Sequence, residues 1–313
     1  MNYEQTLVVK TAWYYYVENM TQQKISERLG ISRMRVIKLL EKARQDGVIQ
    51  FKIHPDKVHR MELERQLSET WGLKDTFVVP TPPDTEDVNK TIAQAASMYL
   101  SDRISPNSFI NMGYGDTLSR VLNHLATLSE FPVSVVSLTG GVNYYLPNAQ
   151  SHIFNAKLHL LPAPLLVSSP EMVKAMMQEP SVTEIMRMVK LASLTLVGIG
   201  GMSDNATILK NGIVSKNDFF YLSMRGAVGD VLSHFFDKEG NLVHTGIEDR
   251  LISTPLDTLR QLDNVVGVAA GPTKVEAIRA ALRGKYLDTL ITDEETARAL
   301  IDSNHSDEFY SGN

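Results

Sequence analysis

The feature that most constrains the fold lies near the N-terminus, where residues 20–40 have the pattern of two short amphipathic helices around a turn at Gly30. Thr21 and Ser32 each stand directly before a helical run, at the position expected of an N-cap residue. Apolar residues recur at the spacing of one helix face: Ile25, Leu29, Val36, Leu39 and Leu40. The pattern predicts a helix-turn-helix, a motif whose second helix enters the major groove of DNA.

The charge distribution favours DNA as the partner. Residues 21–52 carry 8 lysines and arginines against 3 acidic residues, whereas the rest of the chain carries 23 basic and 33 acidic residues. Most surface charges of proteins are simply solvated, so the alternative to DNA binding is a winged helix with a purely structural role. A basic head on an acidic body nevertheless suits attraction to DNA phosphates. The residues predicted to contact DNA are Thr21, Gln22, Ser32, Arg33, Arg35 and Lys38.

Upstream of this motif, residues 7–17 are apolar enough for a first helix that completes a three-helix core. Val9, Trp13 and Val17 follow one another at intervals of four, so we expect this stripe to face inward. The three consecutive tyrosines at 14–16 could stack on bases, but at helical spacing we expect at least two of the rings to pack in the core.

Downstream of the motif, residues 47–54 alternate apolar and polar residues, as a half-buried strand does. This predicts a short wing that ends at Pro55, followed by a helix over residues 58–72 that a glycine closes. We therefore expect a winged helix-turn-helix domain over residues 1–55. A linker helix and a larger effector-binding domain are expected over residues 56–313.

Composition limits the remaining possibilities. A chain of 313 residues is long enough for two domains, and 43% hydrophobic residues with a net charge of −5 are typical of a folded globular protein. The sequence has no cysteine, no basic and apolar leader and no apolar run long enough to cross a bilayer, so a cytoplasmic protein that does not bind a membrane is expected. No spacing of histidines and carboxylates suggests a metal or a cofactor.

From about residue 88 the chain alternates between strand, glycine loop and helix. This alternation predicts a doubly wound, mostly parallel α/β sheet with helices on both faces. The expected strands are residues 109–112, 133–138, 194–197, 219–222, 265–270 and 287–292. Helical runs are expected after the glycine loops, including one after Gly229 that ends before Asp237.

Loops at the carboxyl ends of parallel strands share one rim of the sheet, so several glycine loops can meet at one ligand. Glycine turns followed by helix N-termini suit an anion, and Lys274 at the start of a helix could meet a phosphate. Alternatively, these glycines serve only the geometry of the turns and bind no anion. Residues 198–203 do not complete the G-x-G-x-x-G spacing, which disfavours a dinucleotide. Asp116 and Asp237 could accept hydrogen bonds from sugar hydroxyls, or could cap helices.

These motifs resemble the SorC family of bacterial sugar-responsive transcriptional regulators, and within it the branch of the Lsr regulators. The resemblance rests on residues 13–30 and 32–42 of the head and on body motifs in family order: GYGDTL at 113–118, LTGGV at 138–142, LPAPL at 161–165, VGIG at 197–200, RGAVGD at 225–230, FFD at 235–237, AIRAALRG at 277–284 and LITDE at 290–294. The loop at 141–148 departs from the Lsr pattern through Tyr144 and Tyr145, which predicts a reshaped pocket.

The resemblance implies a winged helix-turn-helix joined to a body similar to sugar-phosphate isomerases and deaminases, usually tetrameric on operator DNA. In the Lsr branch the effector is the phosphorylated signal autoinducer-2. By matching motifs, the effector site would include Gly115, Asp116, Thr117, Thr139, Gly140, Gly141, Asp237 and Lys274. The function expected is a transcriptional regulator, more specifically a repressor of a carbohydrate-utilisation operon, released from double-stranded DNA by a phosphorylated sugar or polyol and needing no cofactor. The alternatives are a sugar-phosphate isomerase or deaminase with a DNA-binding head, and a structural nucleoid protein.

Overall fold

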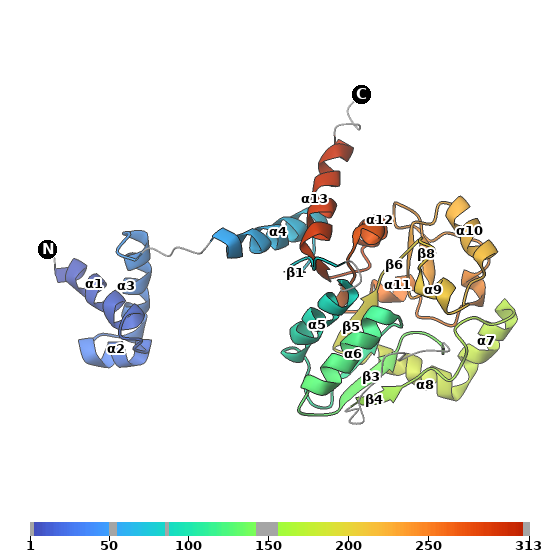
Figure 1. The fold of residues 1–313 in the computed structure, drawn as a ribbon. Coiled ribbons are helices and arrows are strands. Elements are labelled where there is room, and N and C mark those ends of the chain that lie inside the picture. Colours follow the sequence, from blue (N-terminus) through green and yellow to red (C-terminus); the bar gives the residue numbers. More distant parts are fainter. Residues whose placement is uncertain (1–2, 50–54, 85–87, 142–155, 309–313) are drawn as a thin grey trace. The chain divides into compact units, whose positions relative to one another are not determined.

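The computed structural model describes residues 3–49, 55–84, 88–141 and 156–308 (Figure 1). The chain divides into two compact units, Met1–Val58 and His59–Asn313. We call the first the head and the second the body.

The head contains three helices, α1 (Tyr3–Tyr16), α2 (Gln22–Leu29) and α3 (Arg33–Gln45). Thr21 caps α2 by accepting a hydrogen bond from the Lys24 N–H, and Ser32 caps α3 by accepting one from the Arg35 N–H, both at 3.3 Å. Gly30 ends α2 in the left-handed conformation, with φ 63°, which favours a residue without a Cβ atom. The predicted helix-turn-helix is confirmed.

Two small clusters form the core of the head. Ile25, Val36 and Leu40 are buried together, and the three tyrosines at 14–16 pack against them. The second cluster joins α1 to α3 and contains Leu7, Val8, Ala12, Leu39 and Ala43.

The orientation predicted for α1 is wrong. Val9, Trp13 and Val17 are 39%, 55% and 55% exposed, while the neighbouring Thr11 and Ala12 are buried. The small side chains let the backbones of α1 and α3 approach closely, and a tryptophan at that contact would hold them apart. Spacing alone did not distinguish the two faces, because both carry apolar residues.

The predicted wing lies largely outside the described residues, since residues 50–54 belong to that part of the chain. The described segment at 46–49 forms a turn and a bend, with φ 71° at Gly47 and a hydrogen bond from the Ile49 N–H to the Ala43 carbonyl at 3.1 Å.

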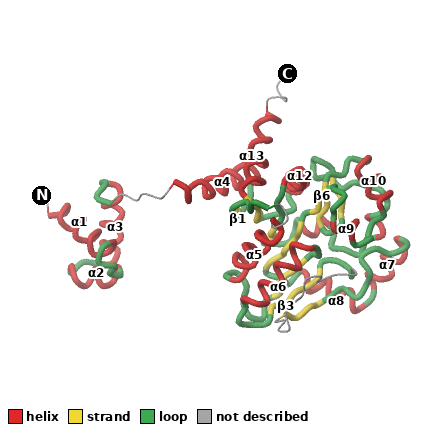
Figure 2. The backbone as a smooth tube through the Cα atoms, viewed as in Figure 1, coloured by secondary structure: helices red, strands yellow, loops and turns green. Residues whose placement is uncertain are grey.

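The body is built on a seven-stranded sheet, and every described pair of neighbouring strands in it is parallel. Its strands are yellow in Figure 2. Its order is β1-β10-β9-β5-β2-β3-β4. The strands are β1 (Asp75–Val79), β2 (Phe109–Met112), β3 (Val133–Ser137), β4 (Ala156–His159), β5 (Leu194–Gly198), β9 (Val265–Val268) and β10 (Thr289–Asp293). The predicted strands at 109–112, 133–138, 194–197, 265–270 and 287–292 fall here.

Helices cover both faces of this sheet, as predicted for a doubly wound fold. On one face, α5 (Val88–Ser101) and α6 (Asp116–Leu128) pack over one hydrophobic core. The helices whose residues join the core on the other face are α4 (Pro55–Trp71), α8 (Pro180–Val189), α11 (Leu256–Leu259), α12 (Val275–Arg283) and α13 (Glu294–Glu308).

A smaller antiparallel sheet, β6 (Gly200–Gly201), β7 (Gly229–Val231) and β8 (His234–Phe236), adjoins the first. The remaining elements are α7 (Pro170–Gln178), α9 (Thr207–Lys210), α10 (Lys216–Met224) and the 3₁₀ turns η2 (Glu248–Arg250) and η3 (Pro272–Lys274). In the part of the chain that the structure describes, no helix is long and apolar enough to span a bilayer.

Two sequence predictions for this region are wrong. Residues 219–222 belong to helix α10 instead of a strand, because Ser215 caps a helix in which Phe219 and Leu222 point inward three residues apart. A short run of aromatic residues is compatible with either period. The run after Gly229 is a hairpin instead of a helix, with Leu232 and Ser233 at φ 54° and 67° in its two-residue turn.

Candidate DNA-binding surface and effector rim

The first candidate site is the exposed face of α3. Arg33, Arg35 and Lys38 are exposed there, and within the described residues none of them forms an ion pair. Two other cations of the head form ion pairs: Arg28 contacts Glu18 at 3.2 Å, and Lys42 contacts Glu4 at 3.1 Å. The three α3 side chains therefore remain available for DNA phosphates and base edges.

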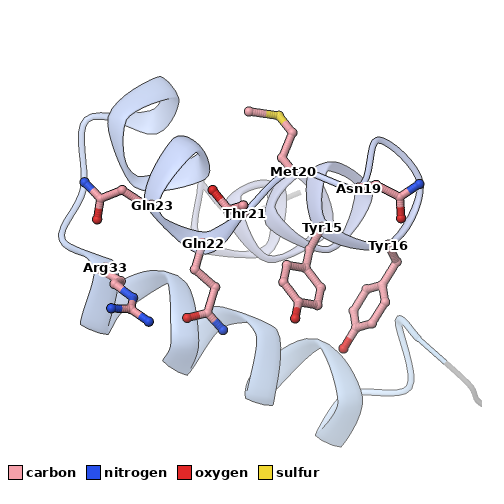
Figure 3. Close-up of a pocket in the computed structure, with 8 residues that line it drawn as sticks. All are labelled: Tyr15, Tyr16, Asn19, Met20, Thr21, Gln22, Gln23 and Arg33. Carbon is pink, nitrogen blue, oxygen red and sulfur yellow. The ribbon is translucent and has the colours of Figure 1, made fainter. Parts of the chain in front are cut away.

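Beside the start of α3 lies an open hollow of about 860 Å³, lined by Tyr15, Tyr16, Asn19, Met20, Thr21, Gln22, Gln23 and Arg33. Figure 3 shows Tyr15, Tyr16 and Gln22 pointing toward α3, with Arg33 at its beginning. Phenol, amide and guanidinium groups all donate hydrogen bonds, and the N-termini of α2 and α3 add backbone N–H groups near Thr21 and Ser32. This surface suits a DNA backbone and contains the predicted contacts Thr21, Gln22 and Arg33, with Ser32 directly before Arg33.

The second candidate site is the carboxyl edge of the parallel sheet. From β2 the chain continues to β3 and β4 on one side, whereas from β5 it continues to β9 and β10 on the other. Neighbouring strands whose connections diverge leave a crevice between their carboxyl ends, which is where ligands bind in such sheets. We call the loops after β2, β3, β5 and β9 the effector rim: residues 113–117, 139–141, 198–201 and 271–274.

The loop after β2 leads directly into α6. Gly115 is its N-cap residue, with φ 132° and no side-chain hydrogen bond to the helix amides. Asp116 opens the helix, accepting hydrogen bonds from the Arg120 Nε at 3.0 and 3.1 Å and from the Asn89 amide at 3.3 Å. Thr117, the second residue of α6, is buried. The N-terminal amides of α6 thus have no side-chain cap.

Lys274 ends η3 directly before α12 and is partly buried. Burial lowers the pKa of its ammonium, while the carboxylates of Asp230 and Asp116 act in the opposite direction. The predicted site residues Asp116 and Lys274 are therefore electrostatically coupled in the folded body.

Asp230 is the residue of this site that sequence reasoning missed. Its Oδ2 accepts a hydrogen bond from the Ser233 N–H at 3.1 Å, and a Cβ atom at Gly200 would overlap its Oδ1. Burial raises the pKa of the Asp230 carboxyl to about 6, although the Ser233 N–H and the Lys274 ammonium both act to lower it. The RGAVGD motif contained the signal, because it ends in Asp230.

Tyr114 fixes the hairpin turn beside Asp230. Its hydroxyl lies 2.8 Å from the Ser233 Oγ, and burial raises the pKa of the phenol. Leu232, in the same turn, lies so close to Gly113 that a Cβ atom there would come within 2.8 Å of its side chain. The β7–β8 turn and the loop after β2 therefore form one packed unit, and both have to move if either does.

The loop at 139–141 uses its amides within the protein. The Gly140 N–H donates to the Ile252 carbonyl and the Gly141 N–H to the Ala163 carbonyl, both at 2.7 Å. Neither amide is available to a phosphate. Thr139 is 1% exposed, and in the described chain its Oγ1 has no hydrogen-bond partner, so only its hydroxyl could serve a ligand.

Asp237 follows strand β8. The sequence had predicted a helix before Asp237, and this prediction is wrong. Its Oδ1 accepts hydrogen bonds from the N–H groups of Glu239 and Asn241, both at 2.9 Å. The turn it holds reaches Gly240, whose carbonyl accepts a hydrogen bond from Tyr286, beyond the C-terminal end of α12. The structure therefore does not bring Asp237 together with Lys274, which precedes the other end of that helix. Tyr144 and Tyr145 lie outside the described residues.

A parallel sheet with this crevice agrees with the comparison to protein families. Residues 56–302 match the family model described as "Putative sugar-binding domain", and residues 4–46 match the model "Sigma-70, region 4". The chain belongs to the SorC family of sugar-binding transcriptional regulators. The helix-turn-helix and the mostly parallel α/β body are the two parts of this SorC-family architecture.

The relatives agree with this assignment. The transcriptional regulator LsrR of Klebsiella pneumoniae subsp. pneumoniae is 36% identical over 305 residues, covering 95% of this chain and 93% of that protein. LsrR of Escherichia coli (strain K12) is 34% identical over 304 residues, with 96% of each chain covered. The chain therefore stands close to the Lsr regulators within the SorC family.

Solved structures extend the comparison. The full-length sorbitol operon regulator SorC from Klebsiella pneumoniae has a TM-score of 0.69 and 27% identity, covering 96% of this chain and all of that one (100%). The sugar-binding domain of a transcriptional repressor from Vibrio fischeri has a TM-score of 0.70 and 27% identity, covering 78% of this chain and 99% of that one. Since these relatives are regulators, the chain is a transcriptional regulator and not an enzyme.

Proposed function

We propose that this regulator is a repressor that leaves its operator when a phosphorylated sugar or polyol binds the effector rim. The Vibrio fischeri relative is named a transcriptional repressor, and the Klebsiella pneumoniae relative is named a sorbitol operon regulator. These names support the sign of regulation and the polyol class. We also propose that the protein acts in the cytoplasm as a homotetramer, which sedimentation of the full chain would test.

The observation that carries the proposal is the coupling of Lys274 to two carboxylates beside an uncapped helix. The α6 amides after Gly115 and the Lys274 ammonium would hold a phosphate, because both present positive charge. The carboxylates of Asp116 and Asp230 would accept hydrogen bonds from hydroxyl groups. A ligand with both a phosphate and hydroxyls satisfies the whole set.

The mechanism is thermodynamic linkage. An effector that binds the free conformation better than the DNA-bound one shifts the equilibrium by the ratio of its two affinities. The effector contributes nothing to the specificity for DNA, which depends on Arg33, Arg35 and Lys38 in the head.

A thermal-shift panel of phosphorylated sugars and polyols tests the effector half of the proposal. Each ligand that stabilises the full chain is compared with its unphosphorylated form, and then with the Lys274→Ala variant. We expect Lys274→Ala to lose most of the shift, whereas Lys210→Ala, an exposed lysine on α9, should keep it. Full retention of the shift by Lys274→Ala would exclude the phosphate role of Lys274.

A gel-shift titration with the DNA upstream of the protein's own gene tests the regulatory half. Arg33→Ala and Arg35→Ala should weaken binding and leave the thermal response to the effector unchanged. The control is Lys10→Ala, an exposed cation on α1. Unchanged affinity in both arginine variants would exclude the assignment of α3 as the recognition helix, and tighter DNA binding on addition of effector would exclude a repressor of this kind.

A further inference from the structure

An exposed methionine lies at the centre of the outward face of α3. The opposite face of this helix is buried and carries Val36, Leu39, Leu40 and Ala43. At 3.6 residues per turn, Met34 points about 170° away from the mean direction of these four residues. Met34 is 63% exposed, so its apolar side chain adds little to the core of the head. The fold therefore gives no reason for an apolar residue at this position.

Cationic side chains surround Met34. Arg33 and Arg35 are its neighbours in the sequence, so they project about 100° to either side of it. Lys38 is one turn farther along the helix and about 40° around it. In the major groove, phosphates line the two walls and base edges form the floor. When the outward face of α3 enters the groove, the arginines reach toward the walls and Met34 points to the floor.

We propose that Met34 contacts the C5-methyl groups of thymines and is a determinant of the sequence that the head binds. The inference deepens the proposed function, because it rests on α3 as the recognition helix. Met34 is the second residue of α3, and the N-terminal residues of a recognition helix are those that contact base edges. The thymine methyl is the apolar group that base pairs present in the major groove. A thioether is at most a weak hydrogen-bond acceptor, so Met34 matches this methyl group and not the donors and acceptors of the other bases.

The charges around Met34 favour DNA over an apolar protein surface as its partner. A partner that buried Met34 would also cover the exposed Arg33 and Arg35, and buried guanidinium groups are costly unless anions pair with them. DNA supplies those anions as phosphates. In the described helix α3 the first turn has no acidic residue, and Glu41, on the same face, is seven residues and about 10 Å from Met34. The end of α3 that carries Met34 is therefore the end that suits the groove.

Replacement of thymine by uracil in the DNA tests the contact directly, because it removes the C5-methyl group and keeps the base pairing. The full-length chain is titrated in gel shifts with the DNA upstream of its own gene, prepared once with thymine and once with uracil. We expect binding to the uracil DNA to be weaker by a factor of about four or more. A factor of four corresponds to about 0.8 kcal/mol, the free energy of burying one methyl-sized group.

Variants at residue 34 show whether Met34 makes the contact. Met34→Ala should bind the two DNAs with equal affinity, whereas Met34→Leu, which keeps an apolar side chain of similar size, should retain the preference for thymine. Met98→Ala, at a methionine 57% exposed on α5, is the matched control and should also retain it. The preference is compared between proteins on the same two DNAs, so the effect of uracil on DNA stiffness cancels.

Two outcomes would overturn the proposal. Equal affinity of the unmodified chain for the two DNAs would mean that it contacts no thymine methyl group, and a full thymine preference in Met34→Ala would assign the contact to another residue. Circular dichroism of Met34→Ala should match that of the unmodified chain, because alanine is favourable at an exposed helical position.

A failure of the proposed function gives a different result. Arg33→Ala and Arg35→Ala should weaken binding to both DNAs by the same factor, because a phosphate contact does not depend on the thymine methyl group. Unchanged affinity in both arginine variants would refute α3 as the recognition helix, whatever the effect of uracil.

Discussion

Replacing Asp230 with asparagine should change how the stability of the body depends on pH. Burial raises the pKa of this carboxyl from 3.8 to about 6 in the folded protein. A carboxyl with a raised folded pKa contributes stability below pH 3.8, and that contribution is lost as the pH rises through 6. The full loss is about 3 kcal/mol, because one pKa unit corresponds to about 1.36 kcal/mol. About two thirds of it falls between pH 4.5 and 7.5.

Asparagine does not ionise, so the Asp230→Asn variant does not lose this stability as the pH rises. We expect the free energy of unfolding of the variant, relative to the unmodified chain, to rise by about 2 kcal/mol between pH 4.5 and pH 7.5. His234, whose pKa burial lowers to about 4, titrates in the same range but is present in both proteins and cancels in the difference.

Urea unfolding followed by tryptophan fluorescence measures this difference. The sequence has two tryptophans, so a Trp13→Phe background leaves Trp71, which is partly buried against the body core, as the only reporter. Asp204→Asn, at an exposed carboxylate, is the matched control and should leave the profile unchanged. Profiles of Asp230→Asn and the unmodified chain that stay parallel within about 0.5 kcal/mol would show that Asp230 is not buried as described.

Three further predictions concern the two units separately. Ile25→Ala should destabilise the head by about 2–5 kcal/mol, since this side chain is fully buried, and should abolish DNA binding while thermal shifts by effector persist. Arg35→Ala should reduce the slope of log affinity against log salt by about 0.9 in gel-shift titrations, the value for one phosphate contact, and an unchanged slope would place Arg35 away from the backbone. Gly200→Ala should displace Asp230 and remove the effector response, as a thermal-shift titration would show.

The head shows which parts of a fold local chemistry determines. The N-caps at Thr21 and Ser32 and the left-handed Gly30 were predictable because each depends on a few adjacent residues. The orientation of α1 was not, because its two faces carry similar apolar residues. Close packing against α3 selected the face with Ala12, and left Trp13 outside.

In the body, the alternation of strand, loop and helix predicted the parallel sheet correctly. The region after residue 200 departs from this alternation. The β7–β8 hairpin depends on two residues with positive φ, Leu232 and Ser233, and leucine is not a residue that signals such a turn. The candidate site depended on the same hairpin, since it brings Asp230 toward Lys274 from 44 positions earlier in the chain. Sequence reasoning found the lysine from its place before a helix, but did not single out Asp230 at the end of the RGAVGD motif.

Helix α4 shares its hydrophobic core with α12, the helix that begins directly after Lys274. Leu63 and Leu67 of α4 are buried in the same cluster as Ala277 and Ile278 of α12. Because α4 has 17 residues, it is about 25 Å long, and a tilt of 10° at its packed end would displace its first residue by about 4 Å. The N-terminal end of α4 is also where the chain passes from body to head. A tilt of this size would move the point at which the chain leaves the body by more than the rise between successive base pairs, about 3.4 Å.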